Sequence, residues 1–249
     1  MSNHTLGIVQ ARMGSSRLYG KILYPLQGTP LLAVLARRVA RAQVEQWWLA
    51  TTRQPEDDLT ASWGEALGWN VYRGSTRDVL SRFGHIIRKE NPEYVVRITA
   101  DDPFTDYQVI DLMLEQARGM SQKHSLLFAG QKAGLPLGYA QGVVVAQRLL
   151  ESEAEIPEDM PYHRSHVISW LVEQGEYTEF VSPEHWPARP GWRWTVDTLQ
   201  DFSMARAAFE AFGNKWPWIS YPEMAAILDN RPDITAINAG VRQKKTEES

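Results

Sequence analysis

A cluster of basic, glycine and serine residues follows the first short apolar run of the chain. It comprises Gln10-Ala-Arg-Met-Gly-Ser-Ser-Arg-Leu-Tyr-Gly-Lys21, with three cations, two glycines and two serines. Backbone N–H groups at glycine, together with Arg and Lys side chains, can bind a polyphosphate. The segment is not a P-loop, because five residues separate Gly14 from Gly20 and Ile22 follows the lysine. A solvated basic turn is the alternative, but the position directly after a strand favours a phosphate site.

Two later segments end in carboxylates where an apolar run stops. Asp101 and Asp102 follow the run 94–99, and Asp197 follows the run 192–196. Magnesium binds carboxylate and phosphate oxygens together, so aspartates at two strand ends near the basic segment predict a magnesium site for nucleotidyl transfer. Strand alternation leaves open whether Asp101 or Asp102 faces the metal. Asp102 and Asp197 could also do no more than begin the helices that follow them.

Short apolar runs that alternate with helical patterns must position these groups. The expected strands in the first half are 6–10, 47–50, 70–72 and 94–99. The expected helices are 31–42, 57–67, 78–90 and 107–118. This alternation is typical of an α/β sheet with crossover helices. It places the basic segment and the aspartates at the carboxyl edge of that sheet.

The middle of the chain, 126–145, has the pattern of strands, and the pattern is less regular after residue 150. We expect strands on both sides of a turn at 134–138, then an acidic loop at 151–160, a helix at 163–173, and strands at 177–181 and 192–196. Thr198 and Asp201 have the spacing of a capping box for a helix that ends at Phe212. We expect one domain over 1–249, with a peripheral elaboration at about 125–190 and a frayed tail at 243–249.

Composition excludes several classes of function. The 249 residues carry a net charge of −4, so no large basic field is present to bind a nucleic acid. The absence of cysteine excludes disulfides, thiolate zinc sites, iron–sulfur clusters and cysteine nucleophiles. No signal-peptide pattern precedes Leu6 and no apolar run reaches 18 residues, so we expect a cytoplasmic protein without a membrane partner.

Four motifs occur in order along the chain. They are the segment 10–21, Arg73-Gly-Ser75 with Asp78-Val-Leu-Ser-Arg82, Arg97-Ile-Thr-Ala-Asp-Asp-Pro103, and Trp194-Thr-Val-Asp197. Over about residues 6–212 the chain resembles the cytidylyltransferases of the spore-coat-polysaccharide type, which are related to the acylneuraminate and 3-deoxy-manno-octulosonate cytidylyltransferases. The resemblance implies a three-layer α/β/α nucleotide-diphosphosugar-transferase-like fold with a mixed, mostly parallel sheet. It also implies that CTP activates a sugar or sugar acid as a CMP-sugar, with release of pyrophosphate, for surface-glycan synthesis.

The resemblance also implies a role for each motif. The implied catalytic residues are Arg12, Lys21, Asp101 and Asp197, and the two aspartates would hold Mg²⁺. The implied nucleotide-binding residues are Gln10, Ala11, Gly14, Ser15, Ser16, Arg17, Arg73, Gly74 and Ser75. The expected partners are CTP, a small acceptor and a second copy of the chain in a homodimer.

The segment 136–142 departs from the pattern of this family. Leu137, Ala140 and Gly142 stand where an acidic pattern is typical, and His163-Arg-Ser-His166 resembles a Glu-Arg-Glu-His segment without its acids. Tyr19 also replaces a typical proline. The expected acceptor-binding residues are Tyr139, Gln141, His163 and Arg164. A non-catalytic nucleotide-binding protein of the same fold, acting in a glycan-assembly complex, is the alternative that these departures leave open.

Overall fold

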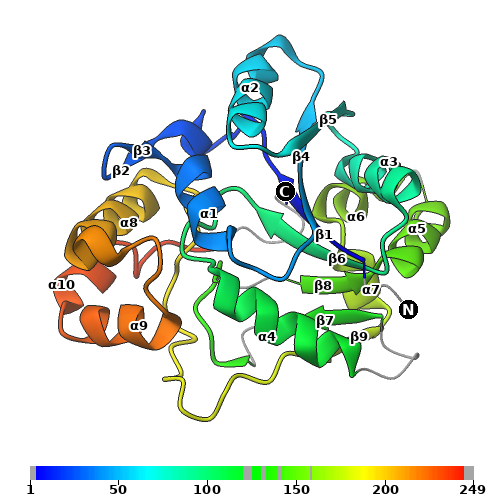
Figure 1. Cartoon of the computed structure of the whole chain (residues 1–249). Coiled ribbons are helices and arrows are strands. Elements are labelled where there is room, and N and C mark those ends of the chain that lie inside the picture. Colours follow the sequence, from blue (N-terminus) through cyan, green and yellow to red (C-terminus); the bar gives the residue numbers. More distant parts are fainter. Residues whose placement is uncertain (1–3, 120–124, 130–132, 140–141, 158, 244–249) are drawn as a thin grey trace.

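One mixed sheet organises the chain. The computed structural model describes residues 4–119, 125–129, 133–139, 142–157 and 159–243. Within these residues a seven-stranded sheet has the order β5-β4-β1-β6-β8-β7-β9 (Figure 1). Its strands are β1 (Thr5–Gln10), β4 (Gln46–Thr52), β5 (Asn70–Gly74), β6 (Tyr94–Thr99), β7 (Leu126–Phe128), β8 (Gly142–Val145) and β9 (Tyr177–Glu179). Strand β8 is antiparallel to both of its neighbours, and the other neighbouring pairs are parallel, so the mixed, mostly parallel sheet is confirmed.

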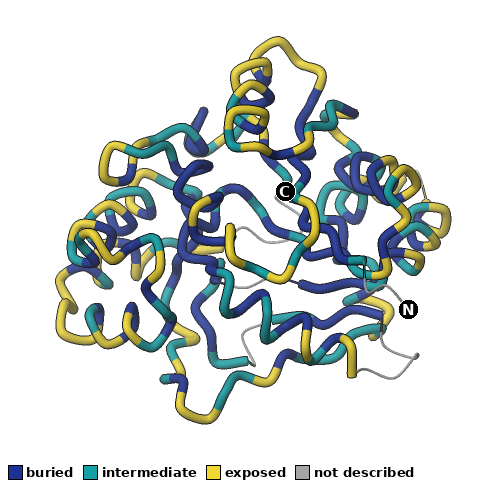
Figure 2. The backbone as a smooth tube through the Cα atoms, in the orientation of Figure 1, coloured by how far each residue is buried: buried dark blue, intermediate teal, exposed yellow. Residues whose placement is uncertain are grey.

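Helices cover both faces of this sheet. Side chains alternate along β1, so Ile8 packs into one core and Val9 into the core on the opposite face. The helices on the Val9 face are α1 (Leu31–Val39), α2 (Asp58–Ala66) and α4 (Tyr107–Arg118). Those on the Ile8 face are α3 (Val79–Glu90), α5 (Ala146–Glu155), α6 (Pro161–His166) and α7 (Ser169–Glu173). Buried backbone runs along the central strands between these two helical layers, which confirms the three-layer architecture (Figure 2).

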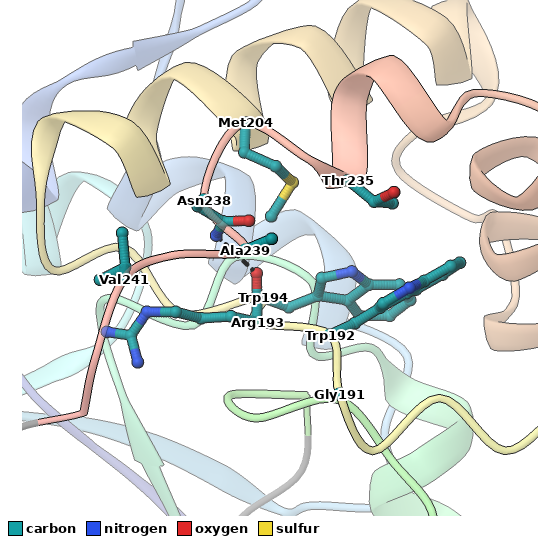
Figure 3. Close-up of a pocket in the computed structure, with 9 residues that line it drawn as sticks. All are labelled: Gly191, Trp192, Arg193, Trp194, Met204, Thr235, Asn238, Ala239 and Val241. Carbon is teal, nitrogen blue, oxygen red and sulfur yellow. Dashed lines mark hydrogen bonds between the residues drawn. The ribbon is translucent and has the colours of Figure 1, made fainter.

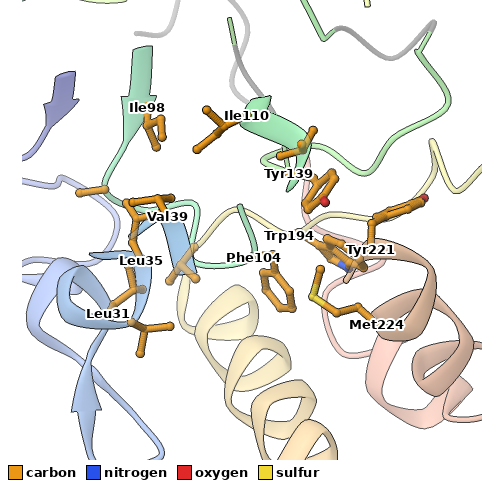
Figure 4. Packing of buried hydrophobic residues seen from close by; sticks show 14 of the residues in the cluster. Leu31, Leu35, Val39, Ile98, Phe104, Ile110, Tyr139, Trp194, Tyr221 and Met224 are labelled. Atoms are coloured by element: carbon orange, nitrogen blue, oxygen red, sulfur yellow. The ribbon is translucent and has the colours of Figure 1, made fainter. Parts of the chain in front are cut away.

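A further helical group extends the core on the Val9 face. It consists of α8 (Leu199–Phe212), α9 (Tyr221–Asp229) and α10 (Pro232–Thr235). The capping box of Thr198 and Asp201 begins α8, as the sequence predicted. Buried aromatic side chains join this group to the sheet, with Phe104 and Trp194 stacked at a centroid distance of 4.8 Å (Figure 4). The short strands β2 (Pro25–Leu26) and β3 (Thr29–Pro30) form a separate hairpin before α1.

Three expectations about secondary structure are wrong. Residues 151–155 continue helix α5 instead of beginning a loop, because Leu149 and Ser152 are buried on its inner face. The helix expected at 163–173 is divided into α6 and α7 by Val167, whose φ of 58° cannot continue an α-helix. Residues 192–196 form no strand, because their pairing is limited to an isolated bridge between Leu137 and Arg193.

None of the helices in the described part of the chain has both the length and the apolar character required to cross a membrane.

Candidate active site

The basic segment and two aspartates meet at the carboxyl edge of β1 and β6. The segment follows β1 directly, and Asp101 lies two residues after β6. The ammonium of Lys21 contacts Asp101 Oδ2 and lies 2.8 Å from Asp197 Oδ1. Lys21 is only 8 % exposed, so this contact among three charged groups is largely enclosed by protein. The structure therefore brings together three of the four residues expected to be catalytic.

Asp197 is surrounded by cations. Arg17 and Arg193 donate to its Oδ2 at 2.9 and 2.6 Å, while Lys21 contacts Oδ1. Burial alone would raise the pKa of Asp197, but these cations outweigh burial and lower the pKa. Burial likewise acts to lower the pKa of Lys21, and the two aspartates reverse that effect and raise it. Lys21 and Asp197 therefore both carry charge at neutral pH.

The basic segment is held in shape by its own backbone and by Asp57. The carbonyl of Met13 accepts hydrogen bonds from the N–H groups of Ser15 and Gly20, at 2.8 and 2.9 Å. Gly20 has a φ of 66°, a conformation that favours glycine. The fully buried Asp57 accepts from the N–H of Met13 at 2.7 Å. Sequence analysis missed Asp57, because its helix-starting position gives no sign of a partner 44 positions away.

The other expected nucleotide-binding residues border the same edge. The exposed Arg12 donates to the carbonyl of Thr76 at 3.3 Å, which links the basic segment to the loop after β5. Arg73 donates to the carbonyls of Thr52 and Gln54 and pairs with Asp58 at 2.6 Å. On the other side, Gln10 accepts from Arg97 at 3.1 Å. Gly74 has no space for a side chain, because a Cβ would lie 2.7 Å from Arg82 Cγ.

The adjacent aspartates after β6 have different surroundings. Asp101 keeps a side-chain exposure of 21 % and faces Lys21. Asp102 is 1 % exposed and accepts a hydrogen bond from Thr99 Oγ1 at 2.5 Å. Burial and the neighbouring Asp101 raise the pKa of Asp102 well above its ordinary value. Packing thus distinguishes the two carboxylates: Asp102 is enclosed, and Asp101 is the more exposed one, in contact with Lys21.

A glycine turn closes tightly over Asp102. Gly138 has a φ of 88°, and a Cβ there would lie 2.7 Å from Asp102 Oδ1 and 2.6 Å from the backbone nitrogen of Thr195. Any larger residue at position 138 would push the turn away from the segment that leads to Asp197. The glycine therefore permits the close approach of these segments below the site.

The predicted acceptor-binding residues do not gather at this edge. Tyr139 is fully buried and donates its hydroxyl to Asp106 at 2.9 Å, so in this structure it offers no group to an acceptor. His163 is buried, with Nδ1 2.9 Å from Ser169 Oγ, and Arg164 pairs with Asp78 at 3.0 Å. Both side chains have protein partners between α3, α6 and α7, and their role toward an acceptor stays a prediction. Gln141 lies outside the described residues.

The second histidine of α6, His166, was not among the residues expected to bind the acceptor. His166 stacks on Tyr162 with ring centroids 4.2 Å apart, and its pKa is lowered by burial and also by the charge of Arg97. Arg97 lies within β6 and also donates to Gln10, the last residue of β1. Spacing alone could not distinguish His163 from His166.

The carboxylates of Asp101 and Asp197 fit magnesium better than a softer metal. Both contact one cation, the ammonium of Lys21, so they converge on a single point. In the described part of the chain no group of three or more His, Cys, Asp or Glu residues could hold a metal. Two carboxylates with open positions for phosphate and water suit Mg²⁺, which retains such ligands, rather than a metal that needs a complete protein cage.

Comparison with known proteins identifies the family. A sequence profile described as Cytidylyltransferase matches residues 6–178. The spore coat polysaccharide biosynthesis protein SpsF of Bacillus subtilis is 32% identical over 243 residues, covering 93% of this chain and 96% of that protein. The chain belongs to the cytidylyltransferase family. This membership places it among the CTP-dependent nucleotidyltransferases.

Other relatives in the family extend this assignment. A 3-deoxy-manno-octulosonate cytidylyltransferase of Anaeromyxobacter sp. (strain K) is 30% identical, covering 66% of this chain and 71% of that protein. A cytidylyltransferase structure from Leptospira borgpetersenii superimposes with a TM-score of 0.83 at 24% identity, covering 97% and 98% of the two chains. A CMP:2-keto-3-deoxy-manno-octonic acid synthetase complexed with CTP gives a TM-score of 0.61 at 16% identity, covering 83% and 98%. These structures confirm the expected fold.

Proposed function

We propose that the protein transfers CMP from CTP to a hydroxyl of a small sugar or sugar acid and releases pyrophosphate. The observation that carries this proposal is the placement of Lys21 between Asp101 and Asp197, beside a loop shaped for phosphate. The relatedness to SpsF supports a product used in surface-glycan synthesis. A homodimer, a cytoplasmic location and a dependence on Mg²⁺ belong to the same proposal.

Each group of the basic segment has a part in this reaction. Arg12, Arg17 and Lys21 would neutralise the triphosphate, and the N–H groups of the loop would orient it for in-line attack. Asp101 and Asp197 would hold Mg²⁺, which when bound supplies positive charge beside the reacting phosphate. Arg73, Gly74 and Ser75 would lie along the base and ribose. In this proposal the acceptor hydroxyl would approach from the side of Asp101, whose side chain is 21% exposed.

At positions 137 and 142, the two described positions where an acidic pattern is typical, the chain offers no polar side chain to a highly hydroxylated acid. Leu137 is half-buried, and a Cβ at Gly142 would lie 3.1 Å from Leu126 Cδ1, against the apolar core. An acidic side chain at position 142 would therefore enter that core at a high cost. We accordingly propose an acceptor that is smaller or less hydroxylated than octulosonate or neuraminate.

Pyrophosphate release tests the proposed reaction. The purified protein would be incubated with CTP, Mg²⁺ and a panel of sugars and sugar acids, with UTP and ATP as controls. We expect release with CTP and at least one acceptor. CTP binding without release for any acceptor would instead support the alternative, a non-catalytic nucleotide-binding protein in a glycan-assembly complex. Release in the absence of any acceptor, as simple hydrolysis, would contradict both.

A further inference from the structure

Arg193 contacts the oxygen of Asp197 that Lys21 does not contact. Its terminal nitrogen donates to Asp197 Oδ2 at 2.6 Å, and its Nε donates to Asp201 Oδ1 at 2.9 Å. Arg193 is 7 % exposed, so protein surrounds the guanidinium. Because the guanidinium is planar and its donors are fixed in direction, it ties the Asp197 side chain to the first turn of α8.

Asp201 holds the backbone at the same place. Its Oδ2 accepts from the N–H groups of Asp197 and Thr198, at 3.1 and 2.9 Å. Asp201 is fully buried. Arg193 and Asp201 therefore fix both the main chain and the side chain of Asp197.

The C-terminal segment 238–243 completes this arrangement. Asn238 is buried and donates to the carbonyl of Arg193 and to Asp201 Oδ1, at 2.9 Å each. Gln243 accepts from the remaining terminal nitrogen of Arg193 at 2.6 Å. Figure 3 shows Asn238 and Arg193 on the wall of a pocket, with the chain passing from Asn238 to Val241 beside the guanidinium. Every one of these residues lies beyond residue 178, where the family match ends.

We propose that Arg193, Asp201 and Asn238 form a brace that positions Asp197 for metal binding, which makes the segment 238–243 part of the active site. The inference rests on the proposed function, in which Asp197 is a metal ligand. Arg17 and Lys21 belong to the phosphate loop and are expected to turn toward a triphosphate. Arg193 lies outside that loop, so it stays on Oδ2 and leaves Oδ1 of Asp197 directed toward the side of Asp101.

Binding of the Mn²⁺–CTP complex tests the brace without any acceptor. The dissociation constant is measured from the enhancement of water-proton relaxation when Mn²⁺–CTP binds the protein. Arg193→Lys keeps the charge but cannot span both aspartates, and we expect it to weaken Mn²⁺–CTP binding about tenfold or more, the usual effect of losing a partner that orients a ligand. Binding of CTP in EDTA should stay within about twofold of wild type, because the brace acts on the metal ligand.

Arg189→Lys is the matched control. Arg189 forms the same kind of fork with Asp229, at 2.8 and 2.6 Å, on the exposed surface. This variant should bind Mn²⁺–CTP like wild type. Asn238→Ala and the surface change Gln243→Ala provide further variants should Arg193→Lys fail to fold. We expect about tenfold weakening for the former and a smaller loss for the latter, whose side chain is exposed.

Two results would distinguish a failure of the brace from a failure of the metal site. If Asp197→Asn weakens Mn²⁺–CTP binding but folded variants of Arg193, Asn238 and Gln243 do not, the brace is refuted and the metal site remains. If Asp197→Asn also binds like wild type, the metal role in the proposed function is refuted, and the brace with it.

Discussion

Lys21 Nζ lies 2.8 Å from Asp197 Oδ1, although 176 positions separate the two residues in the sequence. The contact joins the loop after β1 to the segment before α8. No local sequence pattern predicts this contact, because only the tertiary fold brings the two segments together.

Lys21→Ala should lower turnover of CTP by about two orders of magnitude or more. An ammonium that binds a triphosphate in an enclosed site contributes on the order of 3 kcal/mol to transition-state stabilisation. Steady-state pyrophosphate release measures the effect. Lys89→Ala is the control, because the Lys89 side chain is 60% exposed on α3. Turnover of Lys21→Ala equal to that of Lys89→Ala would refute the assignment of the phosphate loop.

Chelation should abolish activity. After EDTA treatment we expect Mg²⁺ or Mn²⁺ to restore pyrophosphate release, because the donors at Asp101 and Asp197 are oxygen atoms. Zn²⁺ should restore little, since the chain has no thiolate that would favour it. Full activity in a metal-free preparation, verified by elemental analysis, would be incompatible with the proposed metal site.

Octulosonate and neuraminate should be poor acceptors. A site that binds hydroxyls discriminates by hydrogen bonds, and Leu137 and Gly142 supply no side-chain hydrogen bond. We expect kcat/KM below about 10⁴ M⁻¹s⁻¹ for both acids, which is the low end of the usual range for enzymes. A higher value with either acid would show that polar groups elsewhere compensate.

The buried Asp102 and the paired Asp101 should respond in opposite ways to replacement by asparagine. Burial and Asp101 raise the pKa of Asp102, so the ionisation of Asp102 destabilises the folded state. The contribution of protonated Asp102 to the free energy of unfolding is fully present below the pKa of the unfolded state. It is lost as the pH rises through the raised pKa of the folded state. Asp102→Asn should therefore melt at a higher temperature than wild type at pH 8, and the difference should diminish toward pH 4.

Asp101→Asn provides the comparison for that measurement. It removes a partner of the buried Lys21, so it should lower the melting temperature at pH 8. An equal loss of stability in both variants would contradict the distinction between the two aspartates. Thermal unfolding followed by circular dichroism at both pH values decides it.

Arg38→Met should destabilise the fold by about 3–5 kcal/mol, because it leaves a buried carboxylate without its cation. Arg38 is fully buried, 3.3 Å from Asp106 Oδ2 and 3.0 Å from the carbonyl of Phe104. The adjacent Arg37→Met is the control. Arg37 is exposed and lies 5.8 Å from the ring of Trp216, so we expect a loss of less than about 1 kcal/mol. Urea unfolding of both variants provides the comparison.

The sequence predicted those site residues that lie in segments directly after a strand. Alternating strands and helices place Lys21 and Asp101 at one edge, because parallel strands share a direction. The difference in exposure between Asp101 and Asp102 depends on packing by Thr99 and Gly138. The hydrophobic periodicity of the sequence does not predict this packing. Tyr139 was expected to bind the acceptor as a polar residue of the segment 136–142, but its hydrogen-bond partner Asp106 lies 33 positions away.

The brace behind Asp197 was equally hidden from sequence. Asn238 reaches Arg193 across 45 positions, after the chain has passed through three helices and turned back. The tail expected to fray from residue 243 begins at a side chain that contacts Arg193. The sequence predicted that Asp201 forms a capping box, but not that Asp201 also accepts a hydrogen bond from the N–H of Asp197.

The lysine between the two aspartates has a consequence for the order in which ligands arrive. While Lys21 occupies that position, the free site already contains its own counter-ion and presents little attraction to a lone divalent cation. A metal–nucleotide complex would differ, because its phosphates would offer Lys21 a new partner and so leave Asp101 and Asp197 available to hold the metal. Lys21 would therefore compete with a lone divalent cation for the two carboxylates, but not with a metal–nucleotide complex. Nucleotide and metal would then enter the site together.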